Sequence, residues 1–128
     1  MDADQAIDDL TEISPQVRDV AVVGLQGAVV GTNASSERAE AIVAAAKELL
    51  EAADELHGSE VAQLEAATAA GSVFAIRDNG RLIAATTSFE PTVGLVFYDL
   101  KTCLRSIDPD TTPVRKRAPR KKADDAEA

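Results

Sequence analysis

The sequence predicts an α+β domain in which a five-stranded antiparallel sheet and three helices follow the order helix, two strands, helix, three strands, helix. Three observations lead to this prediction. A chain of 128 residues has room for one domain and a tail. Short strand-like runs are joined by tight turns, of which Asn79-Gly80 is the strongest hairpin signal. Three separate stretches repeat apolar residues with helical spacing. Hairpins with separate helices are typical of the α+β class.

The first element is a helix over residues 4–13, because its apolar residues fall on one stripe and aspartates occupy its first turns. Pro15 ends it, since proline disfavours helical geometry in the residue before it. Strands over residues 17–24 and 28–32 then form a hairpin that turns at Gly27.

A long helix follows, capped by Ser35 or Ser36 and running to about Leu56, with Gly58 suited to the left-handed position after its end. Its apolar stripe comprises Ala39, Ile42, Val43, Ala46, Leu49, Leu50, Ala53 and Leu56. A second run of alanines lies off that stripe, so the helix is apolar over more than one face. Strands over residues 61–68, 72–77 and 81–88 complete the sheet, and Pro91 opens a last helix that reaches Ile107.

Charge divides the chain into a domain, residues 1–110, and a tail, residues 111–128, that we expect to be disordered. Residues 1–112 hold 19 acidic and 7 basic side chains, a net charge of −12, whereas residues 113–128 hold 6 basic and 3 acidic ones, a net charge of +3. So acidic a body is a poor surface for nucleic acid or anionic lipid. Only the tail, which is basic and then acidic, offers a polyanion site. Its basic residues are Arg115, Lys116, Arg117, Arg120, Lys121 and Lys122. The tail can equally be a solubilising extension, or dock on the acidic body or an acidic partner.

Groups for catalysis are scarce, and we expect neither a catalytic residue, a cofactor nor a metal site. Cys103 borders an apolar stripe and is interpreted as a core residue, and His57 as a residue that interacts with a helix C-terminus. No phosphate-binding loop or nucleophile motif occurs. The acidic N-terminus does not resemble a signal peptide, and we expect a cytoplasmic protein.

Several stretches together resemble the roadblock/dynein light chain domain family: residues 17–31, 60–68, 71–77, 81–87 and 91–101. The resemblance covers roughly residues 4–107 and implies a profilin- or longin-like sheet with the first and third helices on one face and the second helix on the other. It also implies a non-enzymatic protein that forms homodimers through the second helix and third strand. Bacterial members commonly regulate small Ras-like GTPases, and others are light chains or scaffold components.

The residues supply their own reason for a dimer. The strand over residues 61–68 contains neither proline nor lysine, so it lacks the usual protection of an edge strand. The core is poor in aromatic residues, which make up 3% of the chain, so support from a second subunit is plausible. Glu65 requires an offset that pairs it with an uncharged residue. The expected interface comprises Ala41, Ala44, Ala45, Glu48, Ala52, Val61, Gln63 and Glu65.

Carboxylates of the long helix, Glu51, Asp54 and Glu55, form either a docking face for a basic patch on a partner or a solvated helix surface. The leading hypothesis is a homodimeric adaptor that binds a small Ras-like GTPase and biases its state or location. The alternative is a dimeric anchor that binds nucleic acid or anionic membrane non-specifically through the tail. A small-molecule sensor is a third hypothesis, against which the scarcity of convergent polar and aromatic residues argues.

Overall fold

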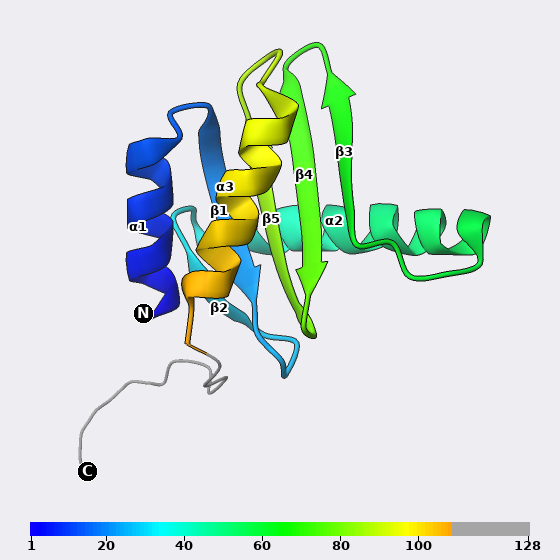
Figure 1. Cartoon of the computed structure of the whole chain (residues 1–128), viewed down its shortest axis with the longest axis horizontal. Coiled ribbons are helices and arrows are strands. Elements are labelled where there is room, and N and C mark those ends of the chain that lie inside the picture. The colour runs from blue at the N-terminus through cyan, green and yellow to red at the C-terminus, as the bar shows by residue number, and fades with distance from the viewer. Residues whose placement is uncertain (109–128) are drawn as a thin grey trace.

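A computed structural model describes residues 1–108 of the chain (Figure 1). The predicted domain boundary at residue 110 and the six basic residues of the tail lie outside the described residues. The elements are α1 (Ala3–Ile13), β1 (Val17–Val23), β2 (Val29–Thr32), α2 (Ser36–His57), β3 (Gln63–Thr68), β4 (Gly71–Asp78), β5 (Arg81–Thr87) and α3 (Val93–Ser106). The predicted α+β class and element order are confirmed.

The sheet has the strand order β2-β1-β5-β4-β3, and every neighbouring pair is antiparallel. The first hairpin, β1–β2, joins the second group of strands through pairing of β1 with β5. This arrangement leaves β2 at one edge and β3 at the other. The prediction that the third strand lies at an edge is therefore correct.

Helices cover both faces of the sheet (Figure 1). On one face α1 and α3 pack side by side over a core that contains Phe74, and Phe97 of α3 meets the Phe74 ring edge-on with centroids 5.0 Å apart. On the other face α2 packs through residues such as Ala46 and Leu50 onto small side chains of the central strands, among them Ala84. The two cores confirm the expected layering, and the small side chains under α2 let the helix lie close to the sheet.

Capping residues near in the sequence fix where most of the helices begin and end. Ser35 caps α2 by accepting a hydrogen bond from the backbone N–H of Arg38 at 3.1 Å, and Gly58 ends the helix in the left-handed conformation with φ of 66°. Asp2 caps α1, so that helix begins one residue earlier than predicted. The last helix begins at Val93, two residues after the predicted Pro91.

The structure corrects the prediction that Leu56 belongs to the buried stripe of the long helix. Its side chain is 84% exposed. The C-terminal half of α2 extends past β3, beyond the edge of the sheet (Figure 1), so no strand lies beneath this end of the helix. The sequence pattern could not reveal where the sheet stops.

Candidate docking surface

Along its length, α2 presents a row of small and aliphatic side chains to solvent. Ala41, Ala45, Ala52 and Leu56 are exposed and Leu49 is half-buried. Their spacing along the chain places these five residues on one side of the helix. We call them the α2 ridge. Of the other predicted interface residues on this helix, Ala44 and Glu48 are exposed on its flank.

Beside the ridge lies the free edge of β3. This strand pairs with β4 from Gln63, opposite Ile76, to Thr68, opposite Gly71, and no described strand pairs with its other edge. The free backbone groups of β3 and the α2 ridge together form one surface, at the edge of the sheet where β3 lies. Edge strands of this kind are templates for pairing with another chain.

The register of β3 places the predicted interface side chains of this strand on a different face of the sheet from those of α2. Gln63 and Glu65 lie opposite Ile76 and Phe74, which belong to the core beneath α1 and α3. They therefore point to the sheet face opposite the α2 ridge, and Glu65 accepts a hydrogen bond from the hydroxyl of Ser72 at 2.6 Å. Only the backbone edge of β3 is shared between the two faces.

The α2 face of β3 instead carries Leu64 and Ala66, both half-buried, and Leu64 packs against the core beneath α2. The predicted interface omitted these two residues, together with Leu49 and Leu56 of the ridge. The alternation along the strand was visible in the sequence. Which of the two alternating sets of side chains faces the long helix became clear only from the pairing with β4.

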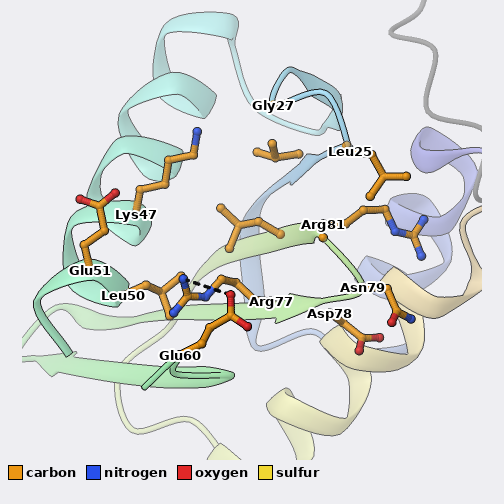
Figure 2. Close-up of a pocket in the computed structure, with 14 residues that line it drawn as sticks. Leu25, Gly27, Lys47, Leu50, Glu51, Glu60, Arg77, Asp78, Asn79 and Arg81 are labelled. Atoms are coloured by element: carbon orange, nitrogen blue, oxygen red, sulfur yellow. Dashed lines mark ion pairs between the residues drawn. The ribbon is translucent and has the colours of Figure 1, made fainter. Parts of the chain in front are cut away.

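An ion-pair clamp centred on Arg77 fixes the connection between α2 and β3. The guanidinium of Arg77 donates to the carboxylate of Asp54 at 2.6 Å and to the carbonyl oxygen of Val61 at 2.7 and 3.0 Å. The same Asp54 oxygen accepts the backbone N–H of Val61 at 2.7 Å. Arg77 also lies 3.9 Å from Glu60, the ion pair that Figure 2 marks. The clamp sets the direction in which the chain leaves α2 and enters the edge strand.

This clamp involves two of the predicted residues. The carboxylate of Asp54 is paired with Arg77 and with the backbone N–H of Val61. The hydrogen bond from Arg77, and then that from Val61, lower the pKa of this carboxyl. Val61 precedes β3 and packs partly buried against the α2 core rather than along the edge. Glu51 and Glu55 remain exposed, on the same flank as Glu48.

A cavity of about 620 Å³ opens on the other side of α2 from the ridge (Figure 2). Lys47, Leu50 and Glu51 of the helix form one wall, and the tips of the β1–β2 and β4–β5 hairpins form the other. The hairpin tips touch, since a Cβ added to Gly80 would lie 2.8 Å from the side chain of Leu25. The wall charges of both signs give the cavity no net preference for an anion or a cation.

The residues with reactive potential are placed in structural positions. Cys103 is buried between α1 and α3, and burial chiefly, with the charge of Asp9, raises the pKa of its thiol to about 12. His57 is the exposed last residue of α2. Within residues 1–108, no three His, Cys, Asp or Glu side chains gather in a way that could hold a metal ion. None of the helices in this part of the chain is both long and apolar enough to cross a membrane.

The fold is that of Roadblock/LC7 domains. A Roadblock/LC7 domain from Streptomyces avermitilis is similar in structure with a TM-score of 0.72 and 17% identity, over 83% of this chain and 94% of that one. A second crystal structure of such a domain from Streptomyces avermitilis gives 0.65 and 20%, over 80% and 95%. Myxococcus xanthus MglB gives 0.58 and 16%, over 80% and 89%. Neither a protein-family model nor a curated protein sequence matches this chain.

Proposed function

We propose that this protein is a non-enzymatic regulatory adaptor that forms a homodimer through α2 and β3 and binds a small Ras-like GTPase. The observation that carries the proposal is the α2 ridge, an exposed row of alanine and leucine side chains on a helix that projects beyond an unpaired edge strand. The Roadblock/LC7 fold supports it, because bacterial proteins of this type commonly regulate such GTPases.

A second copy would satisfy both parts of this surface at once. Pairing of β3 with its counterpart would supply partners for the free backbone groups of the edge. Alanines at positions 41, 45 and 52 would let two α2 helices approach closely, toward the short end of the usual 8–10 Å range of interaxial distances. The joined sheet and paired helices would then form one continuous platform.

The platform would act by binding the two nucleotide states of the GTPase with different affinities, without catalysing a reaction. A preference of about 1.4 kcal/mol for one nucleotide state of the GTPase shifts the population of its states about tenfold. Glu51 and Glu55, exposed beside the ridge, offer an acidic flank for a basic patch on the GTPase. Asp54 lies on the same helix but is already paired with Arg77, so we expect it to contribute less than Glu51 and Glu55.

The test combines a monomeric variant with capture of the partner. Ala45→Asp and Ala52→Asp together place charges in the ridge, and Thr102→Asp, at an exposed position of α3, is the matched control. We expect light scattering after gel filtration to give a dimer for the wild type and the control, and a monomer for the double variant. Immobilised protein should retain a small GTPase from the cell lysate in one nucleotide state, GDP-loaded or loaded with a GTP analogue.

The two parts of the proposal fail separately. A double variant that is monomeric yet retains the GTPase as well as the wild type would refute the dimeric platform. If neither nucleotide condition yields a GTPase, the adaptor function is wrong. Binding that requires residues 113–128, and that disappears at high salt with nucleic acid or lipid as the main species recovered, would favour the anchor function through the tail.

A further inference from the structure

Four large apolar side chains, which we call the end patch, are exposed at one end of the α1–α3 layer. Their exposed fractions are 65% for Ile13, 58% for Phe89, 49% for Leu95 and 68% for Tyr98. The chain contains three phenylalanines, one tyrosine and no tryptophan, so half of its aromatic residues lie in this patch. The other two rings pack against each other at the core. Aromatic side chains are enriched at protein interfaces, and tyrosine is frequent among the residues that dominate binding.

The ends of two helices bring the patch together. Helices α1 and α3 lie side by side and run in opposite directions (Figure 1). Gln16, just after α1, accepts a hydrogen bond from the backbone N–H of Thr92, just before α3, at 2.6 Å. The last residue of α1, Ile13, therefore lies at the same end as the first turn of α3, which contains Leu95. Tyr98 follows Leu95 by one turn of the helix.

Both helices present these side chains at their common junction. Asp9 lies one turn before Ile13 and so on the same side of α1. This side faces α3, because burial and then the charge of Asp9 raise the pKa of the Cys103 thiol. Leu95 precedes Cys103 by eight residues, about two turns, and so lies on the side of α3 that faces α1. The end patch therefore spans both helices.

The loop between β5 and α3 holds the ring of Phe89 in the same region. Gln16 fixes this loop at two points: its backbone carbonyl accepts the N–H of Ser88 at 3.0 Å, and its side-chain oxygen accepts that of Thr92. Between these points Glu90 takes φ of 52°, a left-handed conformation that is uncommon for such a residue. A conformation of this kind persists only where the surrounding contacts impose it. The loop thus presents an exposed phenyl ring in a fixed place.

Carboxylates border the end patch on its α1 side. Helix α1 contains four carboxylates and neither lysine nor arginine. Glu12 adjoins the patch at the end of this helix, and Glu90 adjoins it in the loop. The two cations of α3, Lys101 and Arg105, lie instead toward the carboxylate of Asp78 on β4, with which Arg105 pairs at 2.9 Å. A partner that covers the apolar side chains would therefore meet negative charge along one flank.

We propose that the end patch is a docking site for an amphipathic helix of a partner protein, with lysine or arginine on the flank that lies over α1. The junction of two antiparallel helices can receive the apolar face of a third, and the cations on its flank would complement the carboxylates. This site lies on the sheet face opposite the α2 ridge. One complex could therefore use both surfaces at once, and a dimer formed through α2 and β3 would carry two end patches.

Charge and composition argue against other occupants of the patch. A second copy of this face would bring the carboxylates of two α1 helices together, which is unfavourable. An anionic membrane surface would be repelled for the same reason. Residues 109–128 of the chain contain no aromatic residue, leucine or isoleucine and a single valine, so they offer little with which to cover the two exposed rings.

The test uses the full chain as the target for a display library of peptides of about 18 residues, about five helical turns. Apolar residues are fixed at helical spacing, and the flanking positions are free to be lysine, arginine, glutamine or glutamate. We expect the selection to enrich lysine and arginine over glutamate. The Kd of an enriched peptide, measured by fluorescence anisotropy, should rise between about 0.1 M and about 1 M salt, because salt screens the charges on α1.

Variants of the patch locate the peptide. Leu95→Gln removes the exposed half of a leucine and should raise the Kd roughly three- to tenfold. A triple variant that adds Ile13→Gln and Tyr98→Gln should raise the Kd about 100-fold. The matched control Leu56→Gln removes an exposed leucine from the opposite sheet face and should leave the Kd unchanged.

A second pair of variants tests the charge. Glu12→Gln removes an exposed carboxylate beside the patch and should lower the salt dependence of the Kd. The matched control Glu48→Gln, at an exposed position of α2, should leave the salt dependence unchanged. Melting temperatures close to that of the wild type should show that every variant folds, since all the substituted positions are exposed.

Several results would overturn the proposal. One is a selection that enriches no binding peptide, or only peptides that bind the triple variant as tightly as the wild type. Another is a preference for glutamate at the flanking positions, which would contradict the charge of the partner. Self-association that the triple variant alone lacks would assign the patch to a second copy of this chain. Binding to phosphatidylcholine vesicles that the triple variant alone lacks would assign it to a membrane.

Discussion

Leu56 gives the sharpest test of whether the α2 ridge is buried in the functional state. In the isolated chain this leucine is 84% exposed, on the part of α2 that extends past the sheet. Leu56→Gln keeps a similar helix propensity and makes the side chain polar. In a monomer such a surface substitution should change the free energy of unfolding by less than about 0.5 kcal/mol.

A dimer that covers the ridge changes this expectation. Full burial of a leucine side chain is worth about 1.5–3 kcal/mol. Nearly the whole Leu56 side chain is available for burial, and a symmetric dimer buries two copies, so the loss is about 3 kcal/mol at the low end of that range. Since 1.4 kcal/mol corresponds to a factor of ten, Leu56→Gln should raise the dimer Kd about 100-fold.

Sedimentation equilibrium over a range of protein concentrations measures this Kd directly. The matched control is Ile13→Gln, which replaces another exposed aliphatic residue, 65% exposed, at the end of a helix on the opposite sheet face. We expect the control to dimerise as the wild type does. Equal Kd values for Leu56→Gln, Ile13→Gln and the wild type would refute burial of the ridge at the dimer interface.

Three further predictions follow from particular contacts. Gly71→Ala should lower the melting temperature sharply, because a Cβ there would collide with the backbone oxygen of Thr87 in β5 and φ is +148°. Gly94→Ala should not, because no atom lies within 4 Å of the added Cβ. Arg77→Gln should accelerate hydrogen exchange of the Val61 amide, because it removes the guanidinium that holds both the Val61 carbonyl and Asp54, the carboxylate that accepts this amide. Amides of α1 should keep their protection. The thiol of Cys103, with a pKa of about 12, should resist a thiol reagent at pH 8 until the protein unfolds. Because the folded state favours the neutral thiol, its contribution to the free energy of unfolding is complete below pH 9.0 and is lost between pH 9.0 and about 12.

Features that depend on neighbouring residues could be predicted from the sequence. Asn79 and Gly80 both take positive φ, as a two-residue hairpin turn requires, and Gly58 takes the left-handed position after α2. The exposed alanines of α2 were also predicted to lie off the buried stripe, because helical spacing is fixed at 3.6 residues per turn. These signals sufficed for the element order and the fold class.

Contacts between distant segments could not be predicted in this way. Asp54 looked like its neighbours Glu51 and Glu55, yet it alone meets Arg77, which lies 23 residues further along the chain. The side of β3 that faces α2 depends on the register with β4, and a shift of one residue would exchange the two faces. Asp99 is likewise buried, which the spacing of residues along α3 alone did not show.

The sequence by itself therefore determined the class of the domain, the order of its elements, the charge division between body and tail, and the small, apolar nature of the long helix. Only the tertiary structure decided which parts of that helix the sheet covers and which it leaves free, which carboxylates are paired, and which face each strand residue occupies. The physical reason is that turns, caps and periodicity are governed by interactions over a few residues. Exposure and pairing are governed instead by the packing of segments brought together from far apart in the chain.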